Sequence, residues 1–197
     1  MDFANLNKYK KANLSLAPTT NRVVFMGDSI TEFWGNYNKS FFENNYINRG
    51  ISGQTTSQMV LRFRQDVIDL KPSKVVILAG INDIAQNTGP ISISEIMGNL
   101  ISMVELAQAN AIEVILCSVL PANHFNWNHK IQPADKVIEL NDLIQKYALA
   151  QQIDYVDYYS KMVDTDKGLQ IAFGDDGVHP NAEGYKVMET ILAPFLL

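Results

Sequence analysis

One serine in the sequence stands where a nucleophile would be expected. Ser29 ends the segment Gly27-Asp28-Ser29, which follows the apolar run 23–26 and precedes residues that can start a helix. Open α/β sheets bind ligands at the carboxyl ends of their strands, and a helix N-terminus presents backbone N–H groups to negative charge. A serine in this place can attack a carbonyl carbon. Taken alone, however, Ser29 is better explained as the N-cap of the helix.

A segment near the C-terminus offers a base and a group that can orient the base, both of which a serine nucleophile requires. His179 lies just before the last predicted helix, and the positive end of the helix dipole favours the neutral imidazole that a base needs. Asp176 comes three residues earlier, so a turn can bring its carboxylate to the second ring nitrogen. Each has a plain alternative, with His179 as a surface residue and Asp176 as part of a turn.

Acyl transfer also needs hydrogen-bond donors for the developing oxyanion. Three are predicted, namely the backbone N–H groups of Ser29 and Gly50 and the side-chain amide of Asn82. Glycine lets a substrate approach the backbone closely. Gly50 could equally be a turn residue and Asn82 a helix cap. Taken together, these non-catalytic roles are much less convincing, because four separate segments would have to supply suitable groups at one place by accident.

Three aromatic residues near these segments are candidates for lining a pocket that holds an acyl group or a sugar. They are Trp34, Phe125 and Trp127, although aromatic residues in loops serve local packing as often. Asp28 and Asp83 lie beside the predicted catalytic positions. We interpret both as structural residues that hold neighbouring backbone through hydrogen bonds.

The elements that must position these residues alternate between strand and helix. Strands are predicted at residues 23–26, 46–49, 74–79, 112–118 and 154–157. The runs 23–26 and 74–79 are apolar without alternation, which is typical of strands buried on both faces of a parallel sheet. An α/β fold with a five-stranded parallel sheet and helices on both faces follows. Right-handed crossovers then bring the carboxyl ends of all strands, and the candidate residues with them, to one edge.

Length and composition are those of one globular domain. The 197 residues are 47% hydrophobic and 19% charged, so we expect a single domain over residues 1–197. Residues 1–21 are expected to form an N-terminal helix and a connector, since Phe3, Leu6 and Tyr9 have helical spacing. The lone Cys117 lies in an apolar run and is interpreted as a buried small hydrophobe.

Net charge and hydropathy argue against two classes of binding partner, nucleic acids and the membrane interior. The net charge is −5 and no dense basic cluster exists, which disfavours nucleic-acid binding. No run of about 18 apolar residues is present, so no integral membrane segment is expected. The N-terminus lacks the basic-then-apolar pattern of a signal peptide. A periplasmic or secreted protein is the expectation if an export signal has been removed.

Four motifs, in order along the chain, resemble those of the GDSL, or SGNH, hydrolase family. They are Gly27-Asp28-Ser29-Ile30, Arg49-Gly50, Gly80-Ile81-Asn82-Asp83 and Asp176-Gly177-Val178-His179-Pro180. The first motif alone is a weak signal, whereas the four together are strong. Within the family, the chain is most similar to small bacterial acylhydrolases of the platelet-activating-factor acetylhydrolase-like kind.

The resemblance implies a three-layer α/β/α sandwich with a flavodoxin-like strand order. It implies a serine esterase that works through an acyl-enzyme on Ser29, with His179 and Asp176 completing a triad. It implies an oxyanion hole of Ser29, Gly50 and Asn82, and neither a metal nor an organic cofactor. The expected substrate is a small carboxylic ester, short-chain or acetyl, with an acylated carbohydrate or lipid as the larger molecule.

Two other functions remain open from the sequence. The first is a catalytically idle protein that uses the same scaffold to bind a carbohydrate or lipid; the complete set of catalytic residue types argues against it. The second is a metal-assisted hydrolase using Asp28, Asp175, Asp176 and His179. We rank it last because these residues include no closely spaced histidine pair.

Overall fold

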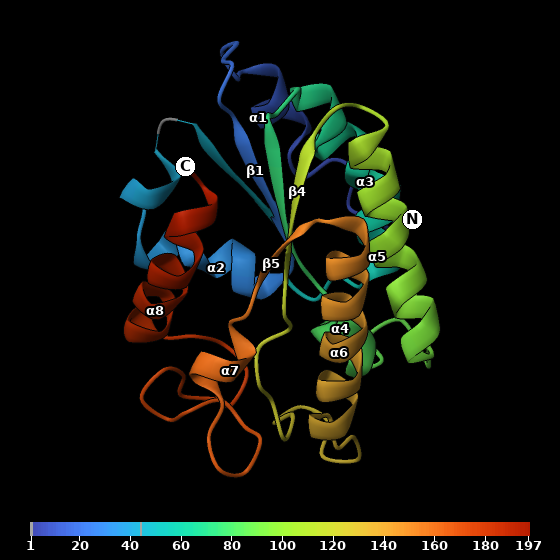
Figure 1. Ribbon diagram of the computed structural model, residues 1–197, viewed down its shortest axis with the longest axis vertical. Helices are drawn as coiled ribbons and strands as arrows, with labels where there is room; N and C mark the ends of the chain where they lie inside the picture. Colours follow the sequence, from blue (N-terminus) through green and yellow to red (C-terminus); the bar gives the residue numbers. More distant parts are fainter. Residues whose placement is uncertain (1, 44) are drawn as a thin grey trace.

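The computed structural model describes residues 2–43 and 45–197 and contains a five-stranded, all-parallel sheet enclosed by helices (Figure 1). The strands are β1 (Val23–Gly27), β2 (Tyr46–Gly50), β3 (Lys74–Leu78), β4 (Glu113–Cys117) and β5 (Asp154–Val156). The α-helices are α1 (Lys10–Leu14), α2 (Ser29–Tyr37), α3 (Thr56–Asp66), α4 (Ile81–Ile84), α5 (Ile93–Gln108), α6 (Ala134–Gln151), α7 (Tyr159–Met162) and α8 (Ala182–Leu192). Short 3-10 helices are η1 (Ser40–Phe42), η2 (Ile68–Leu70) and η3 (Ala193–Phe195).

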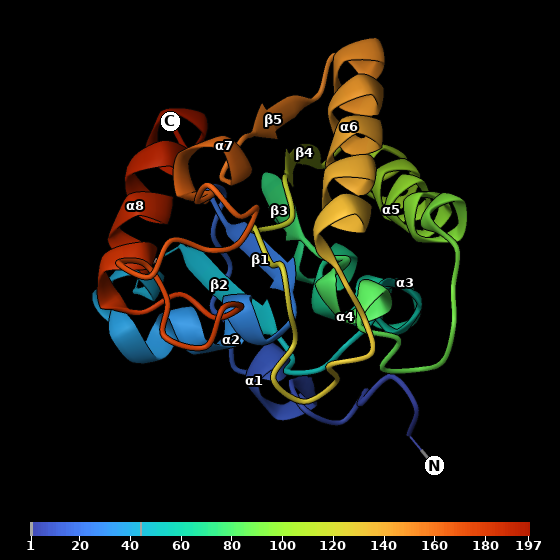
Figure 2. The same ribbon diagram turned by 90° about the horizontal axis from the view of Figure 1, so that it is seen from below.

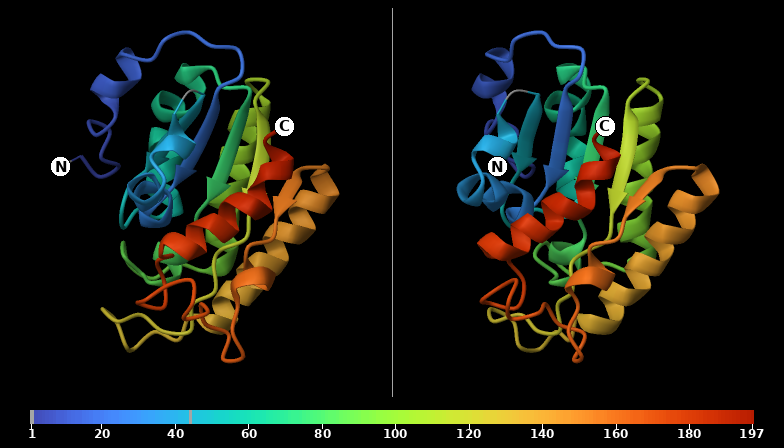
Figure 3. Two further views of the ribbon diagram at one scale, coloured as in Figure 1. Left: turned by 90° about the vertical axis from the view of Figure 1, so that its left-hand side faces the viewer. Right: turned by 60° about the vertical axis from the view of Figure 1, so that its left-hand side comes forward.

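The strand order is β2-β1-β3-β4-β5, with every neighbouring pair parallel. Helices α2 and α8 cover one face of the sheet, and α3, α5 and α6 cover the other (Figures 1 and 3). The predicted three-layer sandwich with a flavodoxin-like order is therefore confirmed. None of the helices within residues 2–43 and 45–197 combines the length and apolar character needed to cross a bilayer.

The interior strands form where the sequence is continuously apolar. All five residues of β1 are buried, as are the last four of β3 and of β4, because helices cover both faces of the sheet. The helices start where capping side chains occur. Thr55 with Gln58 and Ser92 with Glu95 form capping boxes on α3 and α5.

The topological switch point of the sheet, where the strand order reverses, lies between β1 and β3. Connections from β1 run toward the β2 edge, whereas those from β3 run toward β5. Such a switch point leaves a crevice at the carboxyl ends of the strands. Figure 2, which looks onto this edge, shows α2, α4 and the loops before α6 and α8 around the ends of β1 and β3.

The N-terminal segment differs from its prediction. Residues 3–9 are mostly turns and only Lys10–Leu14 is helical, because Phe3 and Leu6 remain substantially exposed and give a longer helix no buried face. Met1, the first residue of the predicted segment, lies outside the described residues. Figure 3 shows the connector arching over the amino edge of the sheet to reach β1.

Candidate active site

The turn between β1 and α2 places Ser29 as the first residue of a helix. Asp28 is the N-cap, and its Oδ1 accepts a hydrogen bond of 3.0 Å from the backbone N–H of Ile30. The Ser29 N–H also belongs to the first turn and has no partner within the helix. Burial raises the pKa of Asp28 to about 7, because the charged carboxylate loses its hydration. The interpretation of Asp28 as a residue that holds this turn is confirmed.

Ser29, His179 and Asp176 lie in one hydrogen-bonded line. The Ser29 Oγ is 2.9 Å from Nε2 of His179, and Nδ1 of His179 is 2.7 Å from Oδ2 of Asp176. The acceptor Oδ2 fixes the proton of the neutral imidazole on Nδ1, which leaves Nε2 free to accept from the Ser29 hydroxyl. The arrangement can remove the hydroxyl proton as the oxygen attacks an electrophile.

Backbone donors hold the Asp176 carboxylate in its ionised form. Its Oδ1 accepts from the N–H groups of Val178 at 2.9 Å and His179 at 2.8 Å. Partial burial acts to raise the pKa of Asp176, but these bonds and the one from the His179 ring outweigh it, so the pKa is lowered. Asp176 therefore carries the negative charge that orients the imidazole.

The loop between β4 and α6 supports the Asp176 turn from outside. Asn126 Nδ2 donates to the Asp176 carbonyl oxygen at 3.1 Å. Gly177 has a φ of +80°, and a Cβ atom there would come within 2.7 Å of the His124 ring. Sequence reasoning missed both supporting contacts, because nothing in a polar loop indicates which backbone it will touch.

A single turn of helix, α4, carries Asn82. Gly80 precedes it with a φ of +127°, and a Cβ atom there would lie 2.7 Å from Leu140 Cδ2, so only glycine fits. Asn82 Nδ2 donates to the Gln54 carbonyl oxygen at 3.1 Å, and its Oδ1 accepts from Asn87 Nδ2 at 2.9 Å. These two contacts fix the amide and, among the residues that the structure describes, leave one of its N–H groups without a partner. Asn87 is a further residue that the sequence did not reveal.

Asp83, next to Asn82, also has a structural role. It accepts from the backbone N–H of Thr56 at 2.9 Å and from the Thr56 hydroxyl at 2.6 Å, which ties α4 to the start of α3. Burial raises the pKa of Asp83 against the opposing effect of these hydrogen bonds. Asp83 thus holds backbone, as expected, but the backbone of α3 rather than its own turn.

Gly50 lies where the sequence places it, at the end of β2 opposite Gly27. A Cβ atom at Gly50 would meet the backbone N of Glu32 at 2.1 Å, so glycine is required by the packing of α2 against β2. Its N–H donates to Asn48 Oδ1 at 2.9 Å. Of the three predicted oxyanion donors, Gly50 is therefore the one whose hydrogen already has a partner.

The prediction that three aromatic residues line a pocket is wrong for two of them, Trp34 and Phe125. Trp34 is 1% exposed and donates from Nε1 to Glu189, and Phe125 is fully buried. Both are core residues, because their rings pack inward. Trp127 is 50% exposed, stacks on Phe125, and has its ring centre 6.4 Å from that of His179.

Phe33 is an aromatic neighbour of the site that the sequence analysis missed. Its ring centre lies 5.5 Å from that of His179. Residues four apart on a helix share a face, so the spacing from Ser29 was a usable signal. Phe33 and Trp127 together flank the imidazole.

The alternative of a metal-assisted hydrolase requires a cluster of side chains that can bind a metal ion. Within residues 2–43 and 45–197, no three His, Cys, Asp or Glu side chains are arranged to hold a metal ion. A hollow of about 660 Å³ does open beside Asp176, and its lining includes both polar residues and the apolar Leu169, Ile171 and Ala172.

The strand order and the serine at its switch point define the class of protein: this is the SGNH α/β hydrolase fold. The chain belongs to the GDSL-like Lipase/Acylhydrolase family, whose sequence profile matches residues 25–187. The resemblance carried by the four motifs is thereby confirmed. A solved GDSL-like lipase from Bacteroides thetaiotaomicron has 48% identity and a TM-score of 0.96 over 98% of each chain.

Two curated relatives are more distant. An acetylxylan esterase of Xylanibacter ruminicola is 29% identical over a 151-residue alignment, which covers 66% of this chain and 29% of the esterase. An uncharacterized lipoprotein of Bacillus subtilis is 34% identical over an 88-residue alignment, which covers 43% of this chain and 36% of the lipoprotein. The match therefore spans about a third of each curated relative.

Proposed function

We propose that the protein is a carboxylic ester hydrolase that transfers a small acyl group to Ser29 and then to water. The observation that carries the proposal is the line from the Ser29 hydroxyl through His179 to Asp176, with distances of 2.9 Å and 2.7 Å. Membership of an acylhydrolase family supports the same class of reaction.

His179 moves the proton in both halves of the proposed reaction. Its Nε2 accepts the Ser29 proton as Oγ attacks the ester carbonyl, and then gives that proton to the departing alcohol. In the second half, Nε2 accepts a proton from water as the water attacks the acyl-enzyme, and returns it to Ser29 Oγ. The ionised Asp176 stabilises the imidazolium that forms each time.

The tetrahedral intermediate places a negative charge on the former carbonyl oxygen. The Ser29 N–H, at the positive end of α2, and the free N–H of Asn82 are the proposed principal donors to it. Gly50 is the third proposed donor. It would share its hydrogen between the oxyanion and Asn48 Oδ1.

A short acyl group on a polar alcohol is the proposed substrate class. The hollow beside Asp176 combines amides, an imidazole and carboxylates with the apolar side chains of Leu169, Ile171 and Ala172, so it offers both hydrogen-bond partners for hydroxyl groups and apolar contacts for a sugar ring. Trp127 offers an exposed aromatic face beside His179 on which a sugar ring can stack. The acetylxylan esterase among the relatives acts, by its name, on an acetylated carbohydrate.

The test is hydrolysis of p-nitrophenyl esters of increasing acyl length by wild type and by Ser29→Ala. We expect the acetate to be hydrolysed fastest and the variant to lose about 10³-fold or more in kcat. Ser102→Ala is the matched control, because that hydroxyl donates to the Gly98 carbonyl within its own helix, α5. Equal turnover by Ser29→Ala and Ser102→Ala would contradict the proposal and favour a binding protein on the same scaffold.

A further inference from the structure

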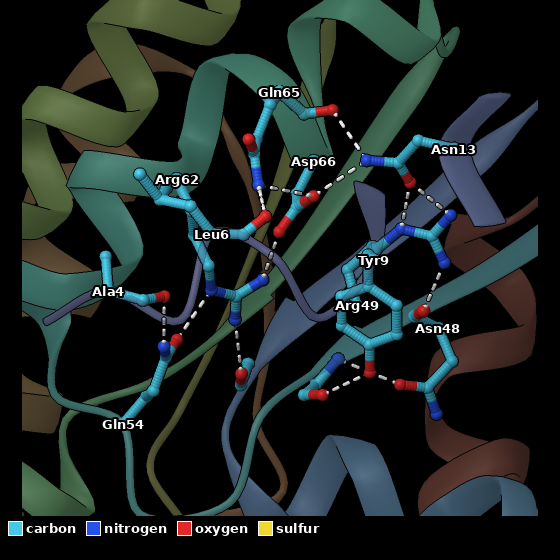
Figure 4. Close-up of polar contacts among 12 residues, drawn as sticks. Ala4, Leu6, Tyr9, Asn13, Asn48, Arg49, Gln54, Arg62, Gln65 and Asp66 are labelled. Carbon is cyan, nitrogen blue, oxygen red and sulfur yellow. Dashed lines mark hydrogen bonds and ion pairs between the residues drawn. The ribbon is translucent and has the colours of Figure 1, made fainter. Parts of the chain in front are cut away.

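Beneath the candidate site lies a buried polar network that the proposed reaction does not use. Arg62 and Asp66 form an ion pair of 3.2 Å, and the side chains of both are fully buried (Figure 4). Burying two charges is costly, and an apolar pair of the same size would be as stable or more so. Stability alone therefore does not explain the ion pair, and the other hydrogen bonds of Arg62 suggest its role.

Arg62 connects the nucleophile turn to the loop after β2. Its Nη2 donates at 3.0 Å to the carbonyl oxygen of Gly27, two residues before Ser29. Its Nε donates at 2.5 Å to Oε1 of Gln54. The backbone carbonyl of Gln54 in turn accepts the amide of Asn82 at 3.1 Å. One guanidinium thus sets the separation between the backbone that carries Ser29 and the residue that orients Asn82.

The N-terminal segment, residues 2–14, closes this network from the outside. Gln54 Nε2 donates to the Ala4 carbonyl at 2.7 Å, so the buried amide is satisfied at both ends. The Tyr9 hydroxyl donates to the carbonyl of Gly50, and the Tyr9 ring lies 4.6 Å below the Arg49 guanidinium. Asn13 joins Arg49 to Asp66 (Figure 4).

Arg62, Tyr9 and the Gln54 backbone each make a hydrogen bond to a segment that carries a proposed oxyanion donor. They fix the carbonyls of Gly27 and Gly50 and the amide of Asn82, which belong to the three chain segments that supply the proposed oxyanion donors. Resting on the function proposed above, we propose that Gln54, Arg62 and Tyr9 are positioning residues for the oxyanion hole. Ala4 and Tyr9 of the N-terminal segment then help to hold these positioning contacts, while Leu6 lies outside them.

A matched pair of glutamines separates positioning from packing. Gln54 and Gln65 each donate a side-chain amide at 2.7 Å to a carbonyl of the same segment, Ala4 and Leu6 respectively. Gln54 also contacts Arg62 through its side chain and Asn82 through its backbone, whereas the further side-chain contact of Gln65 is a long one, of 3.4 Å, to Asp66. Gln54→Met and Gln65→Met keep the side-chain length and remove these bonds. The readouts are kcat and KM for p-nitrophenyl acetate at a temperature well below the unfolding transition of every variant.

We expect kcat of Gln54→Met to fall about 10- to 100-fold with little change in KM, since displacements of about 1 Å cost that much. Gln65→Met keeps kcat within about twofold of wild type. Tyr9→Phe retains the ring on Arg49 and loses only the hydroxyl, so kcat falls about three- to tenfold, the value of one hydrogen bond.

Equal kcat values for Gln54→Met, Tyr9→Phe and Gln65→Met would overturn the inference, as would a loss confined to KM. If Gln54→Met fails to fold, the comparison of kcat between Tyr9→Phe and Gln65→Met decides the question by itself. Failure of the proposed function is distinguishable, because Ser29→Ala would then turn over substrate like wild type.

Discussion

The Ser29 Oγ lies 2.9 Å from the His179 Nε2, although 150 residues separate them in the chain. Packing of α8 against α2 creates this proximity. The Tyr185 hydroxyl donates to the Ile30 carbonyl at 2.8 Å, and Trp34 Nε1 donates to Glu189 at 2.8 Å. Both contacts join α2, which starts at Ser29, to α8, which starts just after His179. The geometry of the site is therefore a property of the fold rather than of either loop alone.

Asp176→Asn should lower kcat by about 10²–10⁴-fold, because an amide can hold the wrong tautomer of His179 and does not stabilise the imidazolium. Asp175→Asn is the matched control for kcat, since that neighbouring side chain is exposed and lines the hollow but lies outside the line from Ser29 through His179 to Asp176. Steady-state kinetics with p-nitrophenyl acetate measure both. A kcat for Asp176→Asn equal to that of Asp175→Asn would show that the carboxylate has no part in the reaction.

Asn82→Ala should reduce kcat by about 10²–10³-fold with a smaller effect on KM, because the amide donates to an oxyanion that exists only after attack. Asn87→Ala removes the contact that fixes the Asn82 amide and not the donor itself, so its loss should be smaller. The two kcat values distinguish the roles. Equal losses would mean that Asn82 acts by holding backbone.

Much of this arrangement was predictable from the sequence because strand ends in a parallel sheet must meet. The runs at β1 and β3 indicated buried strands, and the segments that follow them carry Ser29 and Asn82. A strand over residues 74–79 was predicted, but the single helical turn that follows Gly80 was not, since four residues give too little periodicity.

The failures concern residues whose partners come from distant segments. Trp34 precedes a polar stretch in the sequence, yet it packs against Tyr185 of α8, which no local pattern reveals. In the sequence, Gln54 and Arg62 are ordinary residues before and within a helix, and only the folded chain brings them together under the N-terminal segment. Side-chain networks of this kind depend on tertiary contacts and leave no periodic signal.

Trp127→Ala should raise KM several-fold for an acetylated sugar with little effect on the unfolding temperature, because half of the ring is exposed beside His179. Trp34→Phe should do the reverse. It removes a buried bond to Glu189 and should lower the free energy of unfolding by about 1–3 kcal/mol without changing KM. Kinetics and thermal unfolding of both variants check the assignment, which fails if Trp127→Ala leaves KM unchanged.

Asp28 should make the protein less stable as the pH rises from about 4 to about 7. Burial raises its pKa from 3.8 to about 7, so across this window the unfolded chain releases a proton that the folded chain keeps. The loss should be on the order of 2–4 kcal/mol and absent in Asp28→Asn, whose amide oxygen can still accept from Ile30. Urea unfolding of both proteins across this range measures it. A difference between them that does not vary with pH would contradict the raised pKa.

The most direct test of the account is to trap the acyl group on the protein. Wild type mixed with p-nitrophenyl acetate and quenched in acid within the first turnover should carry one acetyl group, located on Ser29 by peptide mass spectrometry. His179→Ala should acquire it far more slowly, and Ser29→Ala not at all. Ester turnover by wild type with no acetyl group on Ser29, or with the group on another residue, would contradict the proposed mechanism.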